Sequence, residues 1–180
     1  DSPSGLENLE YCILNKRFLS HLDQKIKSCD NEDTIYRFIK AQLFGFSGSP
    51  SGSSFEKAIQ ELKDQKKKSL QYIWYVMPQI AGLSRTYINN FYSIKNFKEA
   101  GEYIGNDFLK QNYITYIDEL TKLLKSSIKI RQILGSDYKK CISSLTLFLF
   151  QFEHDNFTKI KDLLSMQRFL EIFQIIVNLF

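Results

Sequence analysis

The stretch that decides the fold is KKKSLQYIWYVMPQIAGL, residues 66–83. Three lysines lead into an eight-residue run, 70–77, in which Gln71 is the one polar residue and Trp74 is the one tryptophan of the chain. Pro78 ends the run, because proline lacks the amide hydrogen that a helix or a central strand needs. Periodicity alone does not distinguish a buried helix from a buried strand over so short a run.

Outward from this run, apolar residues recur at helical rather than alternating spacing. We expect helices over about 6–29, 34–44 and 107–127, and two further helices that begin at Asp137 and Asn156. No strand-like alternation extends beyond a few residues, and no repeat period is present. The sequence therefore predicts an all-α fold, a single compact multi-helix domain.

Local capping signals mark the start of two other helices. Ser53 and Glu56 have the spacing of a capping box, in which each side chain bonds the backbone amide of the other residue. Asn96 has the same relation to the acid three residues later, and Gly105 is placed to end that helix.

We expect the chain to have three regions. Residues 1–33 read as an N-terminal helical extension, 34–165 as a helical domain, and 166–180 as a C-terminal apolar helix. Within the domain, 47–54 consists of Ser, Gly and Pro, which bury little apolar surface, so we expect a flexible loop there.

The totals exclude several classes of protein. Apolar residues make up 43% and aromatic residues 14%, which is typical of a globular chain. The net charge of +4 is small and both signs are interleaved, which disfavours nucleic acid as a partner. The three cysteines are far apart, which favours a reducing compartment and an intracellular, cytoplasmic location. No apolar run reaches the roughly 18 residues of a membrane span.

Residue types that carry out catalysis are sparse. His21 and His154 are the two histidines, and neither has a partner at metal-ligand spacing, so no metal site is predicted. No carboxylate pair or nucleophile–base motif is present. The sequence therefore gives no basis for assigning a reaction or a cofactor.

A series of blocks resembles the DUF1810 family, also called the Rv1873-like family. The resemblance extends over about residues 36–165 and rests on YRFIKAQ (36–42), AIQEL (58–62), IWYVMPQIAGL (73–83), YSI (92–94), EAGEYI (99–104), GSD (135–137) and SSLTLF (143–148). It implies a compact all-α domain, and it therefore implies that 70–77 is a buried helix ending at Pro78. The family has no established activity.

The chain departs from the family pattern at a few positions. Gln71 stands where the family usually has His, Tyr72 where it has Trp, and Ile142 where it has a basic residue. The Ser/Gly loop at 47–54 is an insertion. A role for a histidine at position 71 is therefore not open to this chain.

One hypothesis is a pocket for a small ligand such as a nucleotide. Aromatic side chains near the end of a helix can stack on a flat ligand, and arginine binds carboxylate or phosphate. The short string at 37–42 is similar to one in NADAR hydrolases, which act on ADP-ribose-linked substrates. The candidate ligand-binding residues are Arg37, Gln42, Tyr72, Trp74, Gln79 and Arg85.

The alternative is a non-catalytic protein–protein interaction module. The N-terminal extension and the apolar residues 169–180 would then supply the partner surface or an oligomer contact. The same apolar residues also suit packing within this chain. Arg37, Gln42 and Trp74 could likewise have a structural role in place of ligand binding, since an apolar helix stripe usually packs into the core.

Overall fold

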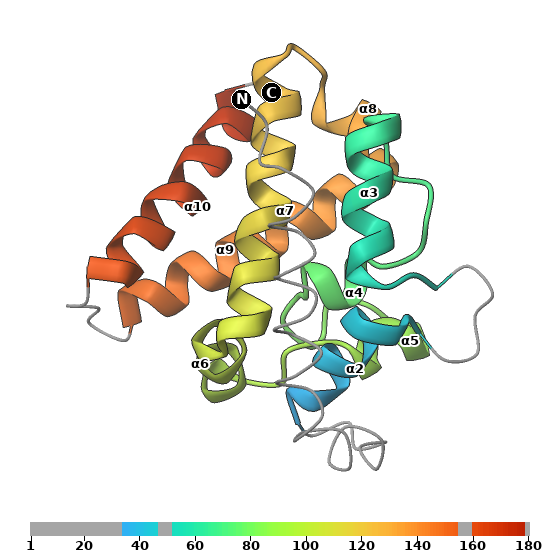
Figure 1. Ribbon diagram of the computed structural model, residues 1–180. Helices are drawn as coiled ribbons and strands as arrows, with labels where there is room; N and C mark the ends of the chain where they lie inside the picture. Colours follow the sequence, from blue (N-terminus) through green and yellow to red (C-terminus); the bar gives the residue numbers. More distant parts are fainter. Residues whose placement is uncertain (1–33, 47–51, 155–159, 179–180) are drawn as a thin grey trace.

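Helix α7 (Asp107–Lys125) runs through the centre of the computed structural model, and helices from both sides of it in the sequence pack around it (Figure 1). The structure describes residues 34–46, 52–154 and 160–178. The other helices are α2 (Tyr36–Phe44), α3 (Phe55–Gln65), α4 (Ile73–Val76), α5 (Tyr87–Phe91), α6 (Phe97–Gly105), α8 (Ile130–Leu134), η1 (Gly135–Asp137), α9 (Tyr138–His154) and α10 (Ile160–Asn178).

The all-α prediction is confirmed for these residues. Strands are absent from the described ranges, which contain two isolated bridges, Gly52 with Gln71 and Ile80 with Ile94. The helix expected at 6–29 lies outside the described residues. No helix within the described part of the chain is long and apolar enough to cross a bilayer.

Helix α7 shows how local sequence sets an element. The side chain of Asn106 accepts the amide of Leu109 at 3.1 Å, and Lys122 and Lys125 lie in the last turn, where cations offset the helix dipole. Its inward face is almost fully buried, and comprises Leu109, Tyr113, Tyr116, Ile117, Leu120 and Leu124, as the spacing predicts.

Helix α10 packs against α7 and α9 of the same chain. Phe169, Ile172 and Ile176 are fully buried, and the Phe169 ring stacks on Tyr113 with 4.9 Å between ring centroids. The sequence left open whether this apolar segment packs within the chain or against a partner. The described part of α10 packs within the chain. Leu170 is its large exposed apolar residue, with 47% of its surface accessible.

The expectation of a helix over 70–77 is only partly right. The helix α4 is limited to Ile73–Val76, although the run around it is buried. The backbone amides of Ser69 and Leu70, before α4, donate to the Glu61 carboxylate instead of to a helix carbonyl. Pro78 prevents continuation at the other end. The run is a buried segment with one helical turn.

The two capping predictions have different outcomes. Asn96 accepts the amide of Glu99 at 2.9 Å, as expected. The cap of α3 is Ser54 rather than Ser53, so the capping-box prediction is wrong by one residue. Ser53 is buried, and its backbone bonds the hydroxyl of Tyr75, which holds it away from the cap position.

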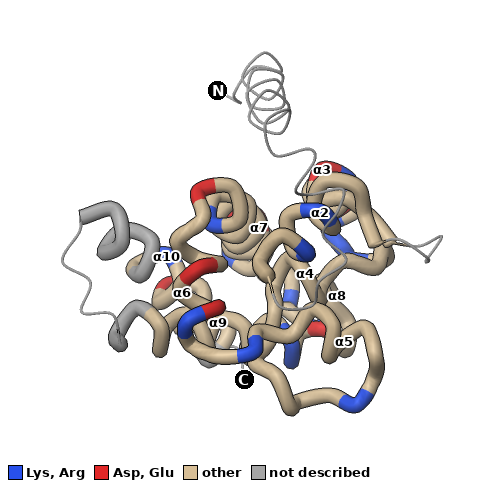
Figure 2. The backbone as a smooth tube through the Cα atoms, turned by 90° about the horizontal axis from the view of Figure 1, so that it is seen from below, with Lys and Arg blue, Asp and Glu red and all other residues tan. Residues whose placement is uncertain are grey.

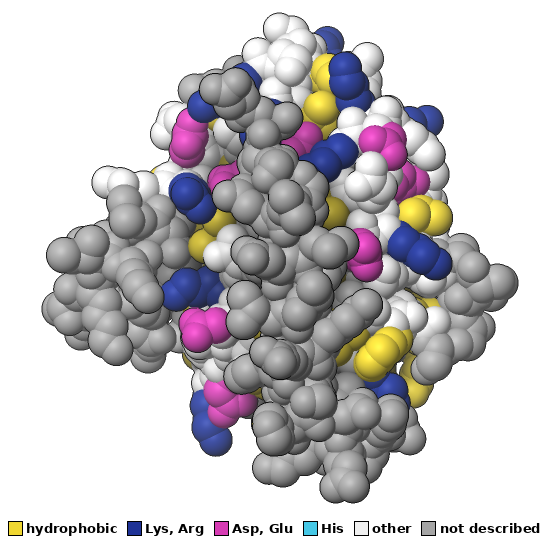
Figure 3. Space-filling model, viewed as in Figure 1, with side chains coloured by type: hydrophobic (Ala, Val, Ile, Leu, Met, Phe, Trp, Pro, Cys, Tyr) yellow, Lys and Arg dark blue, Asp and Glu magenta, His cyan; other side chains and the backbone are white. Residues whose placement is uncertain are grey.

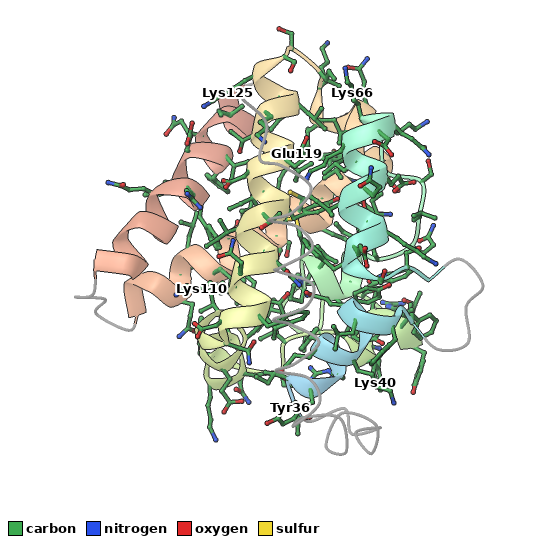
Figure 4. The ribbon with its side chains drawn as sticks, in the orientation of Figure 1. Tyr36, Lys40, Lys66, Lys110, Glu119 and Lys125 are labelled. Atoms are coloured by element: carbon green, nitrogen blue, oxygen red, sulfur yellow. The ribbon has the colours of Figure 1, made fainter. Side chains whose placement is uncertain are left out.

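Charged side chains of both signs are spread over the face shown in Figure 3. Lys66 and Lys125 lie at one end of the molecule and Tyr36 and Lys40 at the other (Figure 4). The lysine run that precedes α4 is not uniformly solvated. Lys68 is buried and pairs with Asp137 at 2.7 Å, which ties this segment to the turn before α9.

Candidate functional site

Arg37 on α2 is a buried side chain, with 2% of its surface accessible. It donates to three backbone carbonyls, at 2.7 Å to Phe91, 2.8 Å to Ser93 and 2.6 Å to Thr34. A planar guanidinium has five N–H donors in a fixed arrangement, which suits several acceptors at once. Arg37 therefore joins the start of α2 to the segment that follows α5.

Glu99 on α6 is the anionic partner of Arg37. Its Oε1 lies 2.5 Å from Nη1 of Arg37, and its Oε2 accepts the amide of Lys95 at 2.6 Å. The side chains of Arg37 and Glu99 are 1% and 7% exposed, so the pair is almost fully desolvated. Four donor contacts of Arg37 are used within the chain, and its role in this arrangement is to position backbone.

Gln42 lies one turn further along α2 in a buried polar network. Its amide nitrogen donates to the carbonyl of Tyr75 at 2.7 Å and to the Tyr103 hydroxyl at 3.1 Å. Its oxygen accepts from Asn112 at 2.9 Å. The network satisfies Gln42 and joins α2, α4, α6 and α7.

Tyr72 is fully buried, and its hydroxyl lies 3.1 Å from that of Tyr116. The Lys68 ammonium lies 5.0 Å from the centre of its ring, within the range of a cation–π contact. Burial raises the pKa of both tyrosines above the ordinary value, so both remain neutral near neutral pH. Tyr72 is thus a core residue in this structure.

Trp74 and Gln79 are partly buried, whereas Arg37, Gln42 and Tyr72 are buried. The indole nitrogen of Trp74 is buried and has no hydrogen-bond partner among the described residues. Gln79 uses its backbone carbonyl to accept the amide of Ile94 at 2.7 Å. The Trp74 ring packs on the core and leaves one unsatisfied donor.

Arg85 is exposed on the segment 81–93, which we call the α5 loop. Two backbone hydrogen bonds close its ends: the amide of Ile94 donates to Gln79, and the amide of Ala81 donates to the carbonyl of Ile94 at 2.8 Å. Gly82 has a φ of 93°, which favours glycine. The loop thus leaves the core and returns at one place, as in the compact surface loops that often carry function.

Two large apolar side chains flank Arg85 in the sequence and are exposed. Leu83 has 58% of its surface accessible and Tyr87 has 70%. Inward from Tyr87, aromatic rings follow one another into the core: Phe91 at 6.0 Å from Tyr87, then Tyr92 at 4.8 Å, then Tyr75 at 5.2 Å from Tyr92. The exposed ring therefore stands on a continuous aromatic support.

Further hydrogen bonds within and beside the α5 loop hold its shape. The Ser93 hydroxyl and the Lys95 ammonium both donate to the carbonyl of Asn90, each at 2.7 Å. Asn89 donates to the Thr86 hydroxyl one turn earlier. These bonds, together with those of Arg37, hold the backbone of 86–95, which carries Tyr87, and Leu83 and Arg85 lie on the exposed stretch just before it.

The charge of this region has one sign. Residues 65–98 contain five lysines and one arginine and no Asp or Glu. In Figure 2, seen from the end that carries α5, the α5 loop shows blue but no red, and Arg85 is its one charged residue. Leu83 and Tyr87 were not among the sequence candidates. The signal that could have indicated them is a stretch without Asp or Glu in which large apolar residues alternate with polar ones.

The six sequence candidates differ in their surroundings. A hollow of about 520 Å³ lies where α2 begins and α6 ends, and none of the six lines it. Arg37, Gln42 and Tyr72 have internal partners, whereas Arg85 projects outward. Within the described ranges, no group of three or more His, Cys, Asp or Glu is placed to hold a metal ion.

Asp137 lies between two lysines where α8 leads into α9. Lys68 and Lys140 each approach its carboxylate to 2.7 Å. Partial burial raises the pKa of this carboxyl, but the hydrogen bonds and charges of the lysines outweigh that effect, so the pKa is lowered overall. The cluster is a structural ion pair that fixes the segment before α4.

The described residues thus define a compact helical domain with a projecting, acid-free loop. The chain belongs to the family described as proteins of unknown function, DUF1810, whose model matches residues 32–169. It is similar in structure to the conserved hypothetical protein Rv1873 from Mycobacterium tuberculosis, with a TM-score of 0.61, 23% identity, and coverage of 78% of this chain and 84% of that one. No curated protein matches the chain.

Proposed function

We propose that the protein is a non-catalytic interaction module that binds a peptide segment of a partner protein at its α5 loop. The observation that carries this proposal is the exposure of Leu83 and Tyr87 on a loop whose base is closed by backbone hydrogen bonds and held by Arg37. Exposed aromatic and aliphatic side chains on rigid supports are typical anchors of protein interfaces.

Rigidity is what separates this loop from other exposed apolar positions. A loop that is already ordered loses little conformational entropy on binding, so more of the contact energy appears as affinity. Arg37 bonds two carbonyls at the end of the loop, and the Ile80–Ile94 bridge closes it. Phe150 and Leu170 are also exposed, but each lies on a long helix, and the exposed Phe44 and Phe97 are the last residue of α2 and the first of α6.

The C-terminal helix α10 is a weaker candidate for this surface, and the N-terminal extension lies outside the described residues. In α10, the apolar side chains Phe169, Ile172 and Ile176 are already buried against α7 and α9. The interaction surface proposed here therefore differs from the one that the sequence suggested, while the class of function is the same.

Selection from a phage-displayed library of random peptides tests the proposal. Peptides selected by the wild-type protein should bind Leu83→Ser and Tyr87→Ser at least about 30-fold more weakly, since interface anchors contribute about 2 kcal/mol or more. Leu170→Ser and Phe150→Ser are the matched controls and should bind as the wild type does. Failure to select any peptide, or equal loss in all four variants, would refute the proposal.

A second candidate function is the binding of a small ligand, such as a nucleotide, beside Trp74. The buried indole nitrogen of Trp74 favours it, because an unsatisfied buried donor costs about 1–3 kcal/mol that an acceptor on a ligand would recover. Gln79 and Arg85 follow in the same stretch of chain, and both side chains are at least partly exposed.

A thermal-shift screen with nucleotides, NAD, ADP-ribose, metal ions and small acids tests this candidate. A ligand at 100 times its dissociation constant stabilises a protein by about 2.7 kcal/mol, which raises the Tm of a chain of this size by several degrees. Trp74→Phe keeps an aromatic ring and removes the N–H, so it should abolish the shift. A shift that Trp74→Phe retains, or no shift with any compound, rules the candidate out.

A further inference from the structure

We infer that the peptide segment recognised by the α5 loop is acidic, with a carboxylate that pairs with Arg85 and apolar side chains that contact Leu83 and Tyr87. This inference rests on the proposed function. Arg85 is exposed, makes no hydrogen bond or ion pair with the described residues, and lies midway in sequence between Leu83 and Tyr87. The loop therefore offers a cation between an aliphatic and an aromatic contact.

The other cations near the loop already have partners. The Lys95 ammonium bonds the carbonyl of Asn90 at 2.7 Å, and Lys98 lies 3.8 Å from the carboxylate of Glu102. Arg37 is buried against Glu99. Within the α5 loop, all of which the structure describes, Arg85 is thus the charge that remains for a partner.

The chemistry of Arg85 and its flanks favours a peptide carboxylate over a nucleic acid. A guanidinium pairs in a planar, two-bond arrangement with a carboxylate. Binding to a nucleic acid backbone draws on several unpaired cations that each neutralise a phosphate. One unpaired arginine flanked by Leu83 and Tyr87 is instead the pattern of a short acidic and apolar motif.

Charge also argues against a second copy of the chain as the occupant. The stretch 81–98 carries three basic residues, Arg85, Lys95 and Lys98, and no acid, so two α5 loops placed face to face would repel each other. An acidic segment has the complementary charge. The field of the neighbouring lysines also attracts it before contact, which raises the association rate at low salt.

Fluorescence anisotropy with three labelled peptides tests the inference. The peptides share one apolar sequence with Phe and Leu anchors and differ only in having Glu, Gln or Lys at the intervening positions. The Glu peptide should bind the wild type about fivefold more tightly than the Gln peptide, which corresponds to about 1 kcal/mol for one exposed ion pair. Added salt should reduce this difference.

Variants at position 85 make the test specific to this arginine. Arg85→Gln should remove the preference for the Glu peptide, and Arg85→Glu should reverse it in favour of the Lys peptide. Lys139→Gln removes one exposed positive charge on α9 and should leave the preference unchanged. Circular dichroism of each variant establishes that it is folded.

The outcomes separate the two proposals. Equal binding of all three peptides, with loss of binding in Leu83→Ser and Tyr87→Ser, keeps the interaction module and overturns the acidic partner. No binding of any peptide by folded wild-type protein, together with failure of the library selection, overturns both. A dimer in sedimentation that Tyr87→Ser dissociates would make a second copy the occupant and would also overturn the inference.

Discussion

Replacement of Arg37 by methionine tests whether this residue organises the base of the α5 loop. Methionine keeps much of the side-chain volume and cannot donate a hydrogen bond. The substitution leaves the carbonyls of Phe91, Ser93 and Thr34 without this donor, and it leaves the Glu99 carboxylate, 7% exposed, without its cation.

The expected loss of stability follows from breaking the Arg37–Glu99 ion pair rather than from a sum over the hydrogen bonds of Arg37. Removal of one partner of a buried ion pair costs about 3–5 kcal/mol, because the other charge stays buried and uncompensated. Charged hydrogen bonds of about 1.5–3 kcal/mol each would sum to more, but two of the carbonyls lie in part-buried positions where water can replace the donor. For a chain of this size, 3–5 kcal/mol corresponds to a decrease in Tm of about 6–20 °C.

Urea denaturation followed by circular dichroism measures the global effect, and amide hydrogen exchange measures the local one. Amides of the α5 loop should lose protection first, since their segment loses its anchor. Arg37→Met combined with Glu99→Gln should recover part of the lost stability, because no buried charge is then left unpaired. Gln can still accept the amide of Lys95, as Glu99 does.

Two results would refute this reasoning. One is an Arg37→Met protein whose free energy of unfolding lies within about 1 kcal/mol of the wild type, the usual range for a surface substitution. The other is unchanged exchange in 81–93 despite global destabilisation. Either would mean that the contacts of Arg37 do not hold the loop.

Three further substitutions have expected outcomes. Phe169→Ala should destabilise the protein by about 3–5 kcal/mol in urea denaturation, whereas Leu170→Ala, its exposed neighbour, should stay within about 0.5 kcal/mol. Gln42→Leu should cost about 1–3 kcal/mol, since it leaves buried polar partners unsatisfied; an unchanged midpoint would show that the network adds nothing. Asp137 has a lowered pKa, so its ion pairs stabilise the fold above pH 3.8 and this contribution disappears as the pH falls through the lower folded value. Asp137→Asn should therefore be less stable at neutral pH, and the difference should vanish in acid; a constant difference in pH-dependent melting would contradict this.

Elements set by local chemistry could be predicted from the sequence. Asn96 caps α6, and the apolar spacing of 107–127 corresponds closely to α7, because both signals act over one or two turns. The cap of α3 was misplaced for a non-local reason. Ser53 bonds Tyr75, which lies 22 residues away, and Ser54 takes the cap position.

The short helix α4 shows a second limit of sequence-based prediction. An apolar run of eight residues indicates burial, and the run is buried. Whether its amides bond within a helix depends on other acceptors, and here the carboxylate of Glu61 takes the amides of Ser69 and Leu70. No pattern within the run contains that information.

In the candidate site, too, the sequence indicates which residues are buried but not which residues they contact. The apolar stripe of α2 indicated that Gln42 is buried, which is confirmed. The partners of Arg37 on the α5 loop and on α6 lie 54 to 62 residues away, so sequence spacing does not reveal them. Leu83 and Tyr87 were missed because exposure depends on where the loop leaves the core.

The closed ends of the α5 loop have a consequence for how the fold can change. The chain leaves at Ile80 and returns beside it at Ile94, and the anchors at the base are backbone carbonyls of Phe91 and Ser93, which every residue type supplies. The exposed part of this segment, 82–87, can therefore be exchanged for another of different length and sequence while Tyr92, which is buried in the core, is kept. Related chains can diversify at this position by insertion and substitution, and the domain is suited to serve as a scaffold for grafted loops.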